Sequence, residues 1–587
     1  MLNSSIADSF DLIADLLDFQ SANPFRVRAY RNSARTIRDY PESLSALAAE
    51  GKEELMKIDG IGEDLATKIV TLVNTGELPM LNELKAQIPP SLPALLRIPG
   101  VGPKKAALLF KELGIKSLDE LKAACAEGKV QKLKGFGVKT EQLIMQGIGI
   151  ASQANERLYW STADRIAQDL RQHMAPCKKI EKMEFGGSFR RGKETIGDLD
   201  LLVVSADVAA VMDRFAEFPG RADTIARGET KMSIRTDAGF QIDLRVVPKE
   251  SFGAALQYFT GSKEHNVILR GMAKAKGLKI NEYGVYKING EKETYIAGET
   301  EADVYATLGL PVFPPEIREA RQEFDWAAKG KLPKLVEEKD IVGDLHMHTH
   351  ATDGTASIEE MAAAARDRGL SYIAITDHSK RVSMASGLDE TRLLAQWAEI
   401  DKINKKHGKK GFLILKGIEC DILENGDMDL SDECLAQADW VVASVHYGQK
   451  QPREQITARI VGALANPHVD CIAHPTGRLL NRRESYDVDM EAVFAAAQKH
   501  GKFLELNANP ARLDLNDVYL AMARDRGIPI VINSDAHSTD GLEVIRFGIL
   551  QAKRGGLTKD QVANTRPWKE VKEMLGKNCS GDYGPQP

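Results

Sequence analysis

The spacing of apolar residues divides the chain into a helical first part and a later part built from strands and helices. Near the N-terminus, apolar side chains recur at three- and four-residue intervals, as in Ile6, Phe10 and Ile13, which is the period of one helix face. After residue 151, short segments alternate apolar and polar positions, and this pattern predicts strands. We therefore expect a multidomain α/β protein whose N-terminal domains are helical.

Two of the predicted strands carry carboxylates on one face. Residues 198–204 read Asp-Leu-Asp-Leu-Leu-Val-Val, so Asp198 and Asp200 share a face while the leucines pack behind them. Asp243 belongs to another alternating segment, 241–247. Adjacent carboxylates repel unless a cation lies between them, which suggests a divalent metal held by oxygen ligands. An isolated Asp-x-Asp is more often a solvated strand edge.

A glycine-rich turn precedes the first carboxylate pair and strengthens the metal interpretation. Gly187 and Ser188 follow a short apolar run, 183–185, and could present main-chain amides to a phosphate group. A phosphoryl-transfer site with two metal ions needs such a set of three carboxylates, with one pair bridging both ions and one near the nucleophile. The segment therefore predicts a nucleotidyltransferase site in an α+β domain.

The last part of the chain contains seven apolar strand candidates, each followed by a helical pattern. The strands are expected at 341–346, 372–377, 412–418, 440–445, 471–473, 503–506 and 529–533. Nearly every one ends in a residue type that binds metals, namely His346, His348, Asp353, His378, Glu419, His446, His474, Asp535 and His537. Strand C-terminal ends share one face in a β/α barrel, so these side chains are expected to converge. Mixed imidazole and carboxylate ligands favour Mn²⁺, Zn²⁺ or Fe²⁺ over Mg²⁺.

Three short segments in the helical part share the form apolar-x-Gly-apolar-Gly before a helical pattern. Glycines at these positions permit a tight turn whose amides, with the next helix N-terminus, face outward. This is the helix-hairpin-helix pattern, which binds the DNA backbone without reading base sequence. The residues expected to contact DNA are Gly60, Gly62, Gly100, Gly102, Lys104, Gly135 and Gly137. A single copy could be a helix-linking turn, but three copies favour DNA binding.

Composition limits the remaining possibilities. The chain has 587 residues, which is enough for three to five domains. Its net charge of −6 does not exclude nucleic acid, because local basic runs matter more for phosphate contact than the total. The six cysteines are scattered without Cys-x-x-Cys pairs, and no apolar run reaches membrane-spanning length. We expect a cytoplasmic, nucleoid-associated monomer that does not interact with membranes.

Residues 1–315 resemble a family X DNA polymerase of the DNA polymerase beta type. The resemblance is carried by Gly-Ser-x-Arg-Arg-Gly, Gly-Asp-x-Asp, Ile-Asp-x-Arg and Tyr-Phe-Thr-Gly-Ser, which occur in that order. It implies that Asp198 and Asp200 bind two Mg²⁺ or Mn²⁺ ions and that Asp243 binds the ion activating the primer 3′-hydroxyl. The nucleotide-binding residues that it implies are Gly187, Ser188, Arg191, Tyr258, Phe259, Gly261, Asn266 and Arg270. His265 stands where polymerase beta has an aromatic residue.

The resemblance also extends to the lyase domain of polymerase beta. Lys68 falls on the Schiff-base lysine and Tyr30 on its aromatic neighbour, while Asp64 replaces a second phosphate-binding lysine. A desolvated lysine can act as an amine nucleophile, but Lys68 could equally be an ordinary DNA-facing lysine.

Residues from 341 onward resemble the polymerase and histidinol phosphatase (PHP) domain, a distorted seven-stranded barrel that holds up to three metals. The matching motifs are His-x-His, Thr-Asp-His, Gly-Ile-Glu, Ser-Val-His, Ala-His-Pro and Ser-Asp-Ala-His. All nine ligand positions are filled, so the resemblance implies an active phosphoesterase using Mn²⁺ or Zn²⁺, with Glu419 bridging two ions. His350 lies outside the pattern, and we expect it not to be a ligand.

These observations predict six segments. They are a lyase-like helical domain (1–85), a helix-hairpin-helix subdomain (86–150), a nucleotidyltransferase palm (151–255), a nucleotide-selection subdomain or thumb (256–315), a linker (316–340) and the PHP domain (341–587). The resemblance implies filling of short gaps with dNTPs during base excision repair. It also implies 3′–5′ exonuclease, abasic-site endonuclease and 3′-phosphatase activities on gapped, nicked or abasic DNA.

Two alternatives stay open at this stage. The palm could transfer nucleotides to RNA or small acceptors, because its motif serves many acceptors. The barrel could instead be a small-molecule phosphatase attached to a DNA-binding module.

Overall fold

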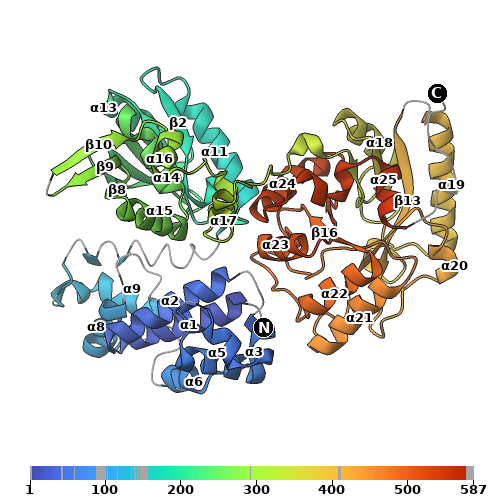
Figure 1. Cartoon of the computed structure of the whole chain (residues 1–587), viewed down its shortest axis with the longest axis horizontal. Helices are drawn as coiled ribbons and strands as arrows, with labels where there is room; N and C mark the ends of the chain where they lie inside the picture. Colours follow the sequence, from blue (N-terminus) through green and yellow to red (C-terminus); the bar gives the residue numbers. More distant parts are fainter. Residues whose placement is uncertain are drawn as a thin grey trace. The chain divides into compact units, whose positions relative to one another are not determined.

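The chain forms two compact units. The computed structural model describes residues 3–20, 22–40, 44–58, 60–86, 101, 103–115, 117–133, 135–137, 140–141, 144–145, 157–290, 292–407 and 411–576. One unit comprises Met1–Arg157, Pro219–Ala226 and Ser233–Ile242, and the other comprises Leu158–Phe218, Arg227–Met232 and Asp243–Pro587. Figure 1 shows the elements of both units. No helix in the described part of the chain is long and apolar enough to cross a membrane.

The N-terminal residues are helical, as predicted. The helices are α1 (Asn3–Phe19), α2 (Pro24–Asp39), α3 (Leu44–Glu50), α4 (Lys52–Met56), α5 (Glu63–Thr75), α6 (Pro79–Ala86), α8 (Pro103–Leu113) and α9 (Leu118–Ala126). The apolar positions spaced along α1 are buried, and Phe10 packs against Tyr30 of α2 with ring centroids 5.8 Å apart. Burial of these apolar faces in one cluster stabilises helices that are individually short.

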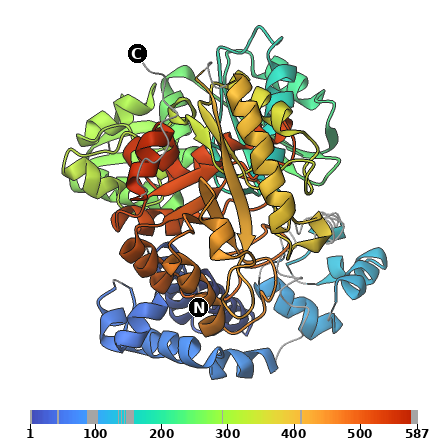
Figure 2. The same ribbon diagram turned by 90° about the vertical axis from the view of Figure 1, so that its right-hand side faces the viewer.

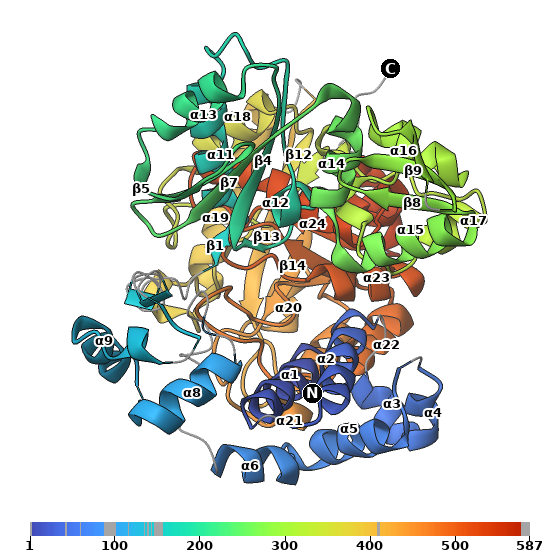
Figure 3. The ribbon, with the colours of Figure 1, turned by 90° about the vertical axis from the view of Figure 1, so that its left-hand side faces the viewer.

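The segment predicted to be the palm contains a five-stranded sheet with the order β2-β4-β7-β6-β5. Its strands are β2 (Lys182–Phe185), β4 (Asp198–Val204), β5 (Arg221–Arg227), β6 (Lys231–Thr236) and β7 (Gln241–Val247). A two-stranded ladder, β1 (Leu158–Tyr159) with β3 (Thr195–Ile196), precedes β4, and α11 (Trp160–Met174), α12 (Gly187–Arg190) and α13 (Val208–Ala216) complete the domain. Figure 3 shows β4 beside β7. The carboxylate-bearing strands are therefore neighbours.

The thumb follows directly in the chain. It contains α14 (Phe252–Thr260), α15 (Lys263–Ala275), the three-stranded sheet of β8 (Leu278–Asn281), β9 (Gly284–Asn289) and β10 (Lys292–Ala297), and α16 (Glu301–Leu308). Its core includes Leu269, Val285, Tyr305 and Phe313. Among these residues lies His265, fully buried, with Nδ1 2.9 Å from Glu323 Oε1 and Nε2 3.0 Å from the Tyr305 hydroxyl.

Part of the connection between the thumb and the barrel is buried. We predicted a linker at 316–340 from the prolines before it and from the charged helical stretch that it contains. In the structure this stretch contains a turn of 3₁₀ helix (Pro315–Ile317) and α17 (Glu323–Ala328). Arg318 and Glu323 are fully buried, because Arg318 pairs with Glu301 and Glu323 binds His265. Paired charges can be buried, and the sequence did not reveal these partners.

The C-terminal part is a seven-stranded parallel sheet in sequential order, curved into a nearly closed barrel, as predicted. Its strands are β11 (Gly343–Asp344), β12 (Tyr372–Ile375), β13 (Leu413–Asp421), β14 (Trp440–Ser444), β15 (Cys471–Ile472), β16 (Phe503–Asn507) and β17 (Ile530–Asn533). The intervening helices include α18 (Ile358–Asp367), α19 (Glu390–His407), α21 (Arg453–Ala465), α22 (Met490–His500) and α23 (Asp517–Asp525), followed by α24 (Ile545–Arg554) and α25 (Trp568–Met574). In Figure 2 these helices lie around the strands.

Successive side chains along the barrel strands point to opposite faces and so belong to two different hydrophobic cores. Tyr372 and Ala374 of β12 belong to a cluster inside the barrel, whereas Ile373 and Ile375 belong to the cluster beneath the helices. Asn564 connects β11 and β17 across the seam of the barrel, because its Nδ2 donates to the carbonyls of Gly343 and Ile532, each 2.7 Å away. A parallel bridge between Met347 and Ala536 joins the same two chain segments. No motif in the sequence indicated that the C-terminal segment contributes to this seam.

Candidate active sites

The palm carboxylates come together on two adjacent strands. Asp198 and Asp200 lie on β4 and Asp243 lies on β7; Asp243 is buried, Asp200 is half-buried and Asp198 is exposed. Burial, followed by the negative charges of Asp198 and Asp243, raises the pKa of Asp200 to about 6. A carboxyl whose ionisation is opposed by two neighbouring carboxylates would be stabilised by a bound cation. The three residues therefore fit a divalent metal site with oxygen ligands.

The turn formed by α12 lies against this carboxylate group. The amide of Gly186 donates to the main-chain oxygen of Asp200 at 2.8 Å. Gly187 has φ of +62°, and a Cβ there would lie 2.8 Å from Asp200 Oδ2. Glycine is required at this position because both the backbone conformation and the approach to Asp200 exclude a larger residue. Ser188 follows in the same helical turn.

Half of the predicted nucleotide-binding residues lie on α14 and α15. Tyr258 and Phe259 lie in the last turn of α14, with ring centroids 5.1 Å apart. Asn266 donates from Nδ2 to the Tyr258 carbonyl at 2.8 Å, which fixes the start of α15 to the end of α14. Arg270 is exposed on α15.

Arg191, another predicted nucleotide ligand, is held by hydrogen bonds to other residues of the protein. Its Nη1 donates to the carbonyl of Thr260 at 2.5 Å, and its Nε donates to Glu319 Oε1 at 3.0 Å. A Cβ at Gly261 would approach Arg191 Nη1 to 3.2 Å, so this glycine leaves room for the guanidinium. These two hydrogen bonds hold the side chain in one orientation.

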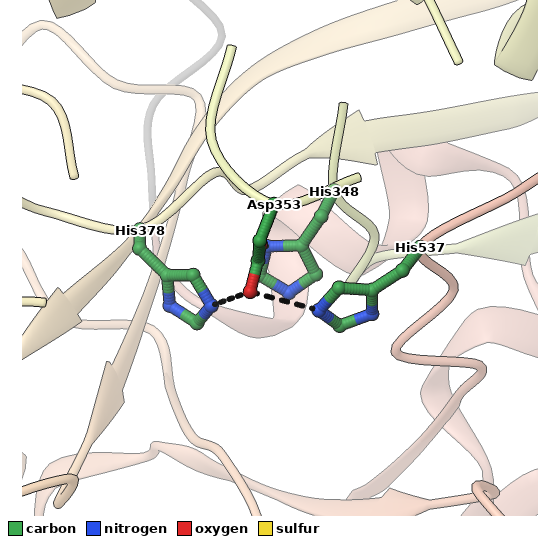
Figure 4. A group of neighbouring side chains, drawn as sticks. All are labelled: His348, Asp353, His378 and His537. Atoms are coloured by element: carbon green, nitrogen blue, oxygen red, sulfur yellow. Dashed lines mark ion pairs between the residues drawn. The ribbon is translucent and has the colours of Figure 1, made fainter. Parts of the chain in front are cut away.

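The barrel brings its predicted metal ligands together at the C-terminal ends of the strands. Within the described residues, three groups have ligand atoms within 4.8 Å of one another: His348, Asp353, His378 and His537; His346, His348 and Asp535; and His378, Glu419 and His446. Figure 4 shows the first group, in which Asp353 Oδ2 lies 3.4 Å from His378 Nε2 and 3.5 Å from His537 Nε2. The groups share His348 and His378 and so form one continuous site.

Glu419 is the centre of this site. Its Oε2 lies 2.7 Å from His378 Nδ1, and its Oε1 lies 3.1 Å from His474 Nε2 and 3.4 Å from His446 Nε2. The surrounding imidazoles hold the pKa of Glu419 well below its usual range despite complete burial. One carboxylate contacted from several sides is suited to bridge metal ions.

Buried atoms without hydrogen-bond partners indicate what the barrel site binds. His346 Nε2 and His348 Nδ1 are buried and have no hydrogen-bond partner in the described part of the molecule. His378 Nδ1 and Glu419 Oε2 lie 2.7 Å apart, but neither atom has a partner with hydrogen-bond geometry among the described residues. Unsatisfied buried polar atoms are costly, and metal coordination would remove that cost. The donor set of imidazoles and carboxylates therefore fits a transition-metal centre.

The sequence did not identify a second layer of residues around the barrel ligands. Glu505 Oε1 lies 2.7 Å from His346 Nδ1, and Asp421 Oδ1 lies 3.2 Å from His446 Nδ1. Both carboxylates are fully buried. An acidic residue within an otherwise apolar strand is the signal that could have identified Glu505. His350, predicted not to be a ligand, contacts the Ala356 carbonyl and belongs to none of the three groups.

The barrel site opens into a cavity of about 290 Å³. Arg512 lines it beside the ligand residues, with Nε 3.7 Å from Asp535 Oδ2. Val382, Met384 and Ala385 form an apolar part of the wall. A cationic group beside a metal-ligand set suits a phosphate-bearing substrate.

The helix-hairpin-helix segments are described in part. Gly60 and Gly135 have φ of +86° and +89°, and the equivalent amides of Ile61 and Phe136 donate to Ile58 and Leu133 carbonyls at 3.0 Å. Gly62 is the N-cap of α5, and the carbonyl of Gly137 accepts from Glu141. The first and third copies thus form equivalent turns. Gly100 and Gly102 lie outside the described residues, and of Lys104 only its main-chain place in α8 is described.

Lys68 lies on α5 with its side chain 17% exposed. Its ammonium group pairs with Asp64 and lies 6.0 Å from the centroid of the buried Tyr30 ring. Lys68, Asp64 and Tyr30, the three residues considered for a lyase site, therefore lie close together in the structure.

Family models match four parts of the chain. They are a helix-hairpin-helix domain (1–78), a SAM-like helix-hairpin-helix tandem (92–149), a DNA polymerase beta thumb (255–319) and a PHP domain (344–509). Together with the palm carboxylates and the barrel site, this combination defines a family X polymerase joined to a PHP metallophosphoesterase.

Full-length similarity specifies the family further. The chain is 40% identical over 581 residues to the DNA polymerase/3′-5′ exonuclease PolX of Bacillus subtilis (strain 168), covering 98% of this chain and 100% of the relative. The chain therefore belongs to the PolX family. A probable phosphatase of Thermoanaerobacter sp. (strain X514) is 32% identical over 40% of this chain and 94% of that protein. DNA polymerase lambda of Rattus norvegicus is 24% identical over 54% of this chain and 56% of that protein.

Proposed function

We propose that this chain fills short gaps in DNA with its palm site and removes nucleotides or blocking phosphates from DNA 3′ ends with its barrel site. The proposal rests on one observation. This chain of the PolX family contains two different sets of residues suited to bind metal ions. The palm set consists of carboxylates beside a glycine turn, and the barrel set consists of histidines gathered around Glu419.

In the palm, Asp198, Asp200 and Asp243 would hold two Mg²⁺ or Mn²⁺ ions. The ions would neutralise phosphate charge and favour ionisation of the primer 3′-hydroxyl. The α12 turn would direct its amides and the Ser188 hydroxyl to the triphosphate, and Arg191 would add a cation. Tyr258, Phe259, Gly261, Asn266 and Arg270 would form the wall around the incoming sugar and base.

In the barrel, the nine histidine, aspartate and glutamate residues would hold up to three ions, for which Mn²⁺ and Zn²⁺ are the best candidates. The metals would activate water near neutral pH and polarise the scissile phosphate. Arg512 is placed to bind a non-bridging phosphate oxygen at the edge of the cavity. This chemistry suits 3′–5′ exonuclease, 3′-phosphatase and abasic-site endonuclease reactions, which all hydrolyse a phosphate ester.

Lys68 would provide a lyase step at an incised abasic site if its amine is released from Asp64. Contact with the Tyr30 ring and limited exposure favour a desolvated amine. Borohydride should then trap a covalent adduct, and Lys68→Ala should prevent trapping. Absence of an adduct with the wild-type protein would leave Lys68 as a phosphate contact.

The proposal is tested with a 5′-labelled primer in a gapped duplex, incubated with Mg²⁺ or Mn²⁺ in the presence and absence of dNTPs. We expect extension to the end of the gap when dNTPs are present and stepwise shortening with Mn²⁺ when they are absent. Parallel reactions with an RNA primer and with a sugar phosphate test the two alternatives. Turnover of the sugar phosphate with neither reaction on DNA would refute the proposal.

A further inference from the structure

One face of helix α24 in the barrel supports the nucleotide-binding turn of the palm. The indole Nε1 of Trp160 donates to the carbonyl of Phe189 at 2.9 Å, and the two rings stack with centroids 4.9 Å apart. Phe547 of α24 packs edge-on against the same indole, 5.8 Å between centroids. The turn is therefore held from behind by an aromatic stack that ends in the barrel.

Two further residues of α24 contact the turn, and they lie at helical spacing from Phe547. A Cβ at Gly192 would lie 3.4 Å from the Leu550 side chain, so the end of the turn rests directly on α24. Arg554 donates from Nη1 to the main-chain oxygen of Arg191 at 2.9 Å. Phe547, Leu550 and Arg554 are separated by three and four residues, which places them on one helix face.

Arg554 also holds the carboxylate that orients Arg191. Its Nη1 donates to Glu319 Oε1 at 2.8 Å, the same oxygen that accepts from Arg191 Nε. Its Nη2 donates to Asp517 Oδ2 at 2.6 Å. Arg554 has only 1% of its side chain exposed, so these interactions are shielded from solvent.

The charges in this cluster form a connected set of ion pairs. Two carboxylates, Glu319 and Asp517, are shared by four cations, namely Arg191, Lys193, Arg321 and Arg554. Burial opposes ionisation of Glu319, but the surrounding cations hold its pKa well below its usual value. Without Arg554, Glu319 would lose a fixed partner and Arg191 would lose the donor to its main chain.

We propose that Arg554 of the barrel is a positioning residue for the polymerase reaction, acting through Arg191 on the triphosphate of the incoming nucleotide. The inference rests on the nucleotide-binding role proposed for Arg191. It makes the barrel a structural part of the palm site in addition to its own hydrolytic role. It predicts that a substitution in α24 changes nucleotide affinity while leaving barrel chemistry intact.

The test is steady-state gap filling by the full-length protein carrying Arg554→Met. We expect the KM for dNTP to rise about tenfold with kcat changed less than about threefold, because a positioned ground-state contact to the triphosphate is weakened. Arg554→Lys keeps the charge near Glu319 and Asp517 and should recover part of the affinity. Lys553→Met is the matched control, since Lys553 lies next to Arg554 on α24 but pairs with Glu316 of the Pro315–Ile317 turn.

Two further measurements separate positioning from misfolding. Mn²⁺-dependent nuclease activity of the same preparations should equal that of the wild type, which shows that the barrel is folded. In the Arg191→Ala background, adding Arg554→Met should leave the KM unchanged, because the effect passes through Arg191. An equal rise in KM in both backgrounds would refute the inference.

The remaining outcomes distinguish this inference from the proposal on which it rests. If Arg191→Ala raises the KM and Arg554→Met does not, the positioning role is refuted while the nucleotide role of Arg191 stands. If Arg191→Ala leaves the KM unchanged, the nucleotide role itself is refuted, and the inference with it.

Discussion

His346 Nδ1 lies 2.7 Å from Glu505 Oε1, and both side chains are completely buried. This contact leaves His346 Nε2 directed to the opposite side, where Glu419 Oε2 and Asp535 Oδ1 lie 3.5 and 3.6 Å away. A carboxylate bound to one imidazole nitrogen fixes the ring and strengthens the other nitrogen as a metal ligand. Glu505 therefore orients the His346 ring in the barrel site, although it is not itself one of the predicted ligands.

Replacing Glu505 with glutamine should weaken the barrel metal site without affecting the palm. We expect Mn²⁺ affinity, measured from the metal dependence of nuclease activity, to fall by about 10- to 100-fold, as for other partners of metal-bound histidines. Gap filling by the same protein should be unchanged. Glu491→Gln is the control, because Glu491 forms a partly exposed pair with Arg526 in the same domain. Equal Mn²⁺ affinity in wild type and Glu505→Gln would contradict the assignment.

Replacing Asp200, the central carboxylate of the palm, should reduce primer extension and leave the nuclease activity of the barrel intact. Asp200→Ala eliminates a ligand shared by both proposed ions, so primer extension should fall by at least about a thousandfold. Mn²⁺-dependent nuclease activity should persist. Asp213→Ala, which removes a largely exposed carboxylate paired with Arg227, provides the control. Extension by Asp200→Ala at near wild-type rate would refute the two-metal assignment.

The N-terminal helices should favour gapped DNA. Arg26, Arg28 and Phe25 are exposed on α2, with the Arg28 guanidinium 5.0 Å from the Phe25 ring centroid. Such a surface can contact a downstream 5′-phosphate, so a short gap should be filled faster than an open primer-template. The advantage should shrink as salt rises, because phosphate contacts depend on counterion release. Equal rates on both substrates at low salt would count against gap filling.

The buried histidine of the thumb should make that domain sensitive to acid. Burial lowers the pKa of His265 below its ordinary value of 6.5, despite the opposing effect of Glu323. The unfolded chain therefore binds more protons as pH falls below about 6.5, and thumb stability should decrease over that range. The intrinsic, base-catalysed rate of amide exchange falls as pH is lowered, so exchange of α15 amides should slow less between pH 7 and 5 than the intrinsic rate does, which means that their protection factors should decrease. His265→Gln should reduce this pH dependence, and an unchanged dependence would refute the role of His265.

Sequence patterns predicted the barrel because its strands are apolar and its ligands stand at strand ends. Seven strands occur where the runs of apolar residues are, and His346, His348 and Asp535 approach one another as the shared strand-end face requires. The same alternation predicted that Asp198 and Asp200 share a face. The local pattern of apolar and polar residues was sufficient to predict these features.

Features that depend on distant partners could not be predicted in this way. Arg318 and Arg554 belong to charged segments that are typical of exposed surface, yet both are buried because Glu301, Glu319 and Asp517 pair with them. Asn564 carries no motif, and its role at the barrel seam depends on carbonyls more than 30 residues away in the chain. Such pairings are tertiary properties, and a single sequence does not reveal them.

The most direct test of two separate sites acting on one DNA end uses primers ending in a 3′-hydroxyl or a 3′-phosphate. Wild type and the His346→Ala, His348→Ala double variant are each incubated with both primers, Mn²⁺ and dNTPs. We expect wild type to extend both primers and the double variant to extend only the 3′-hydroxyl primer. Extension of the blocked primer by the double variant as efficiently as by wild type would contradict the assignment of end processing to the barrel.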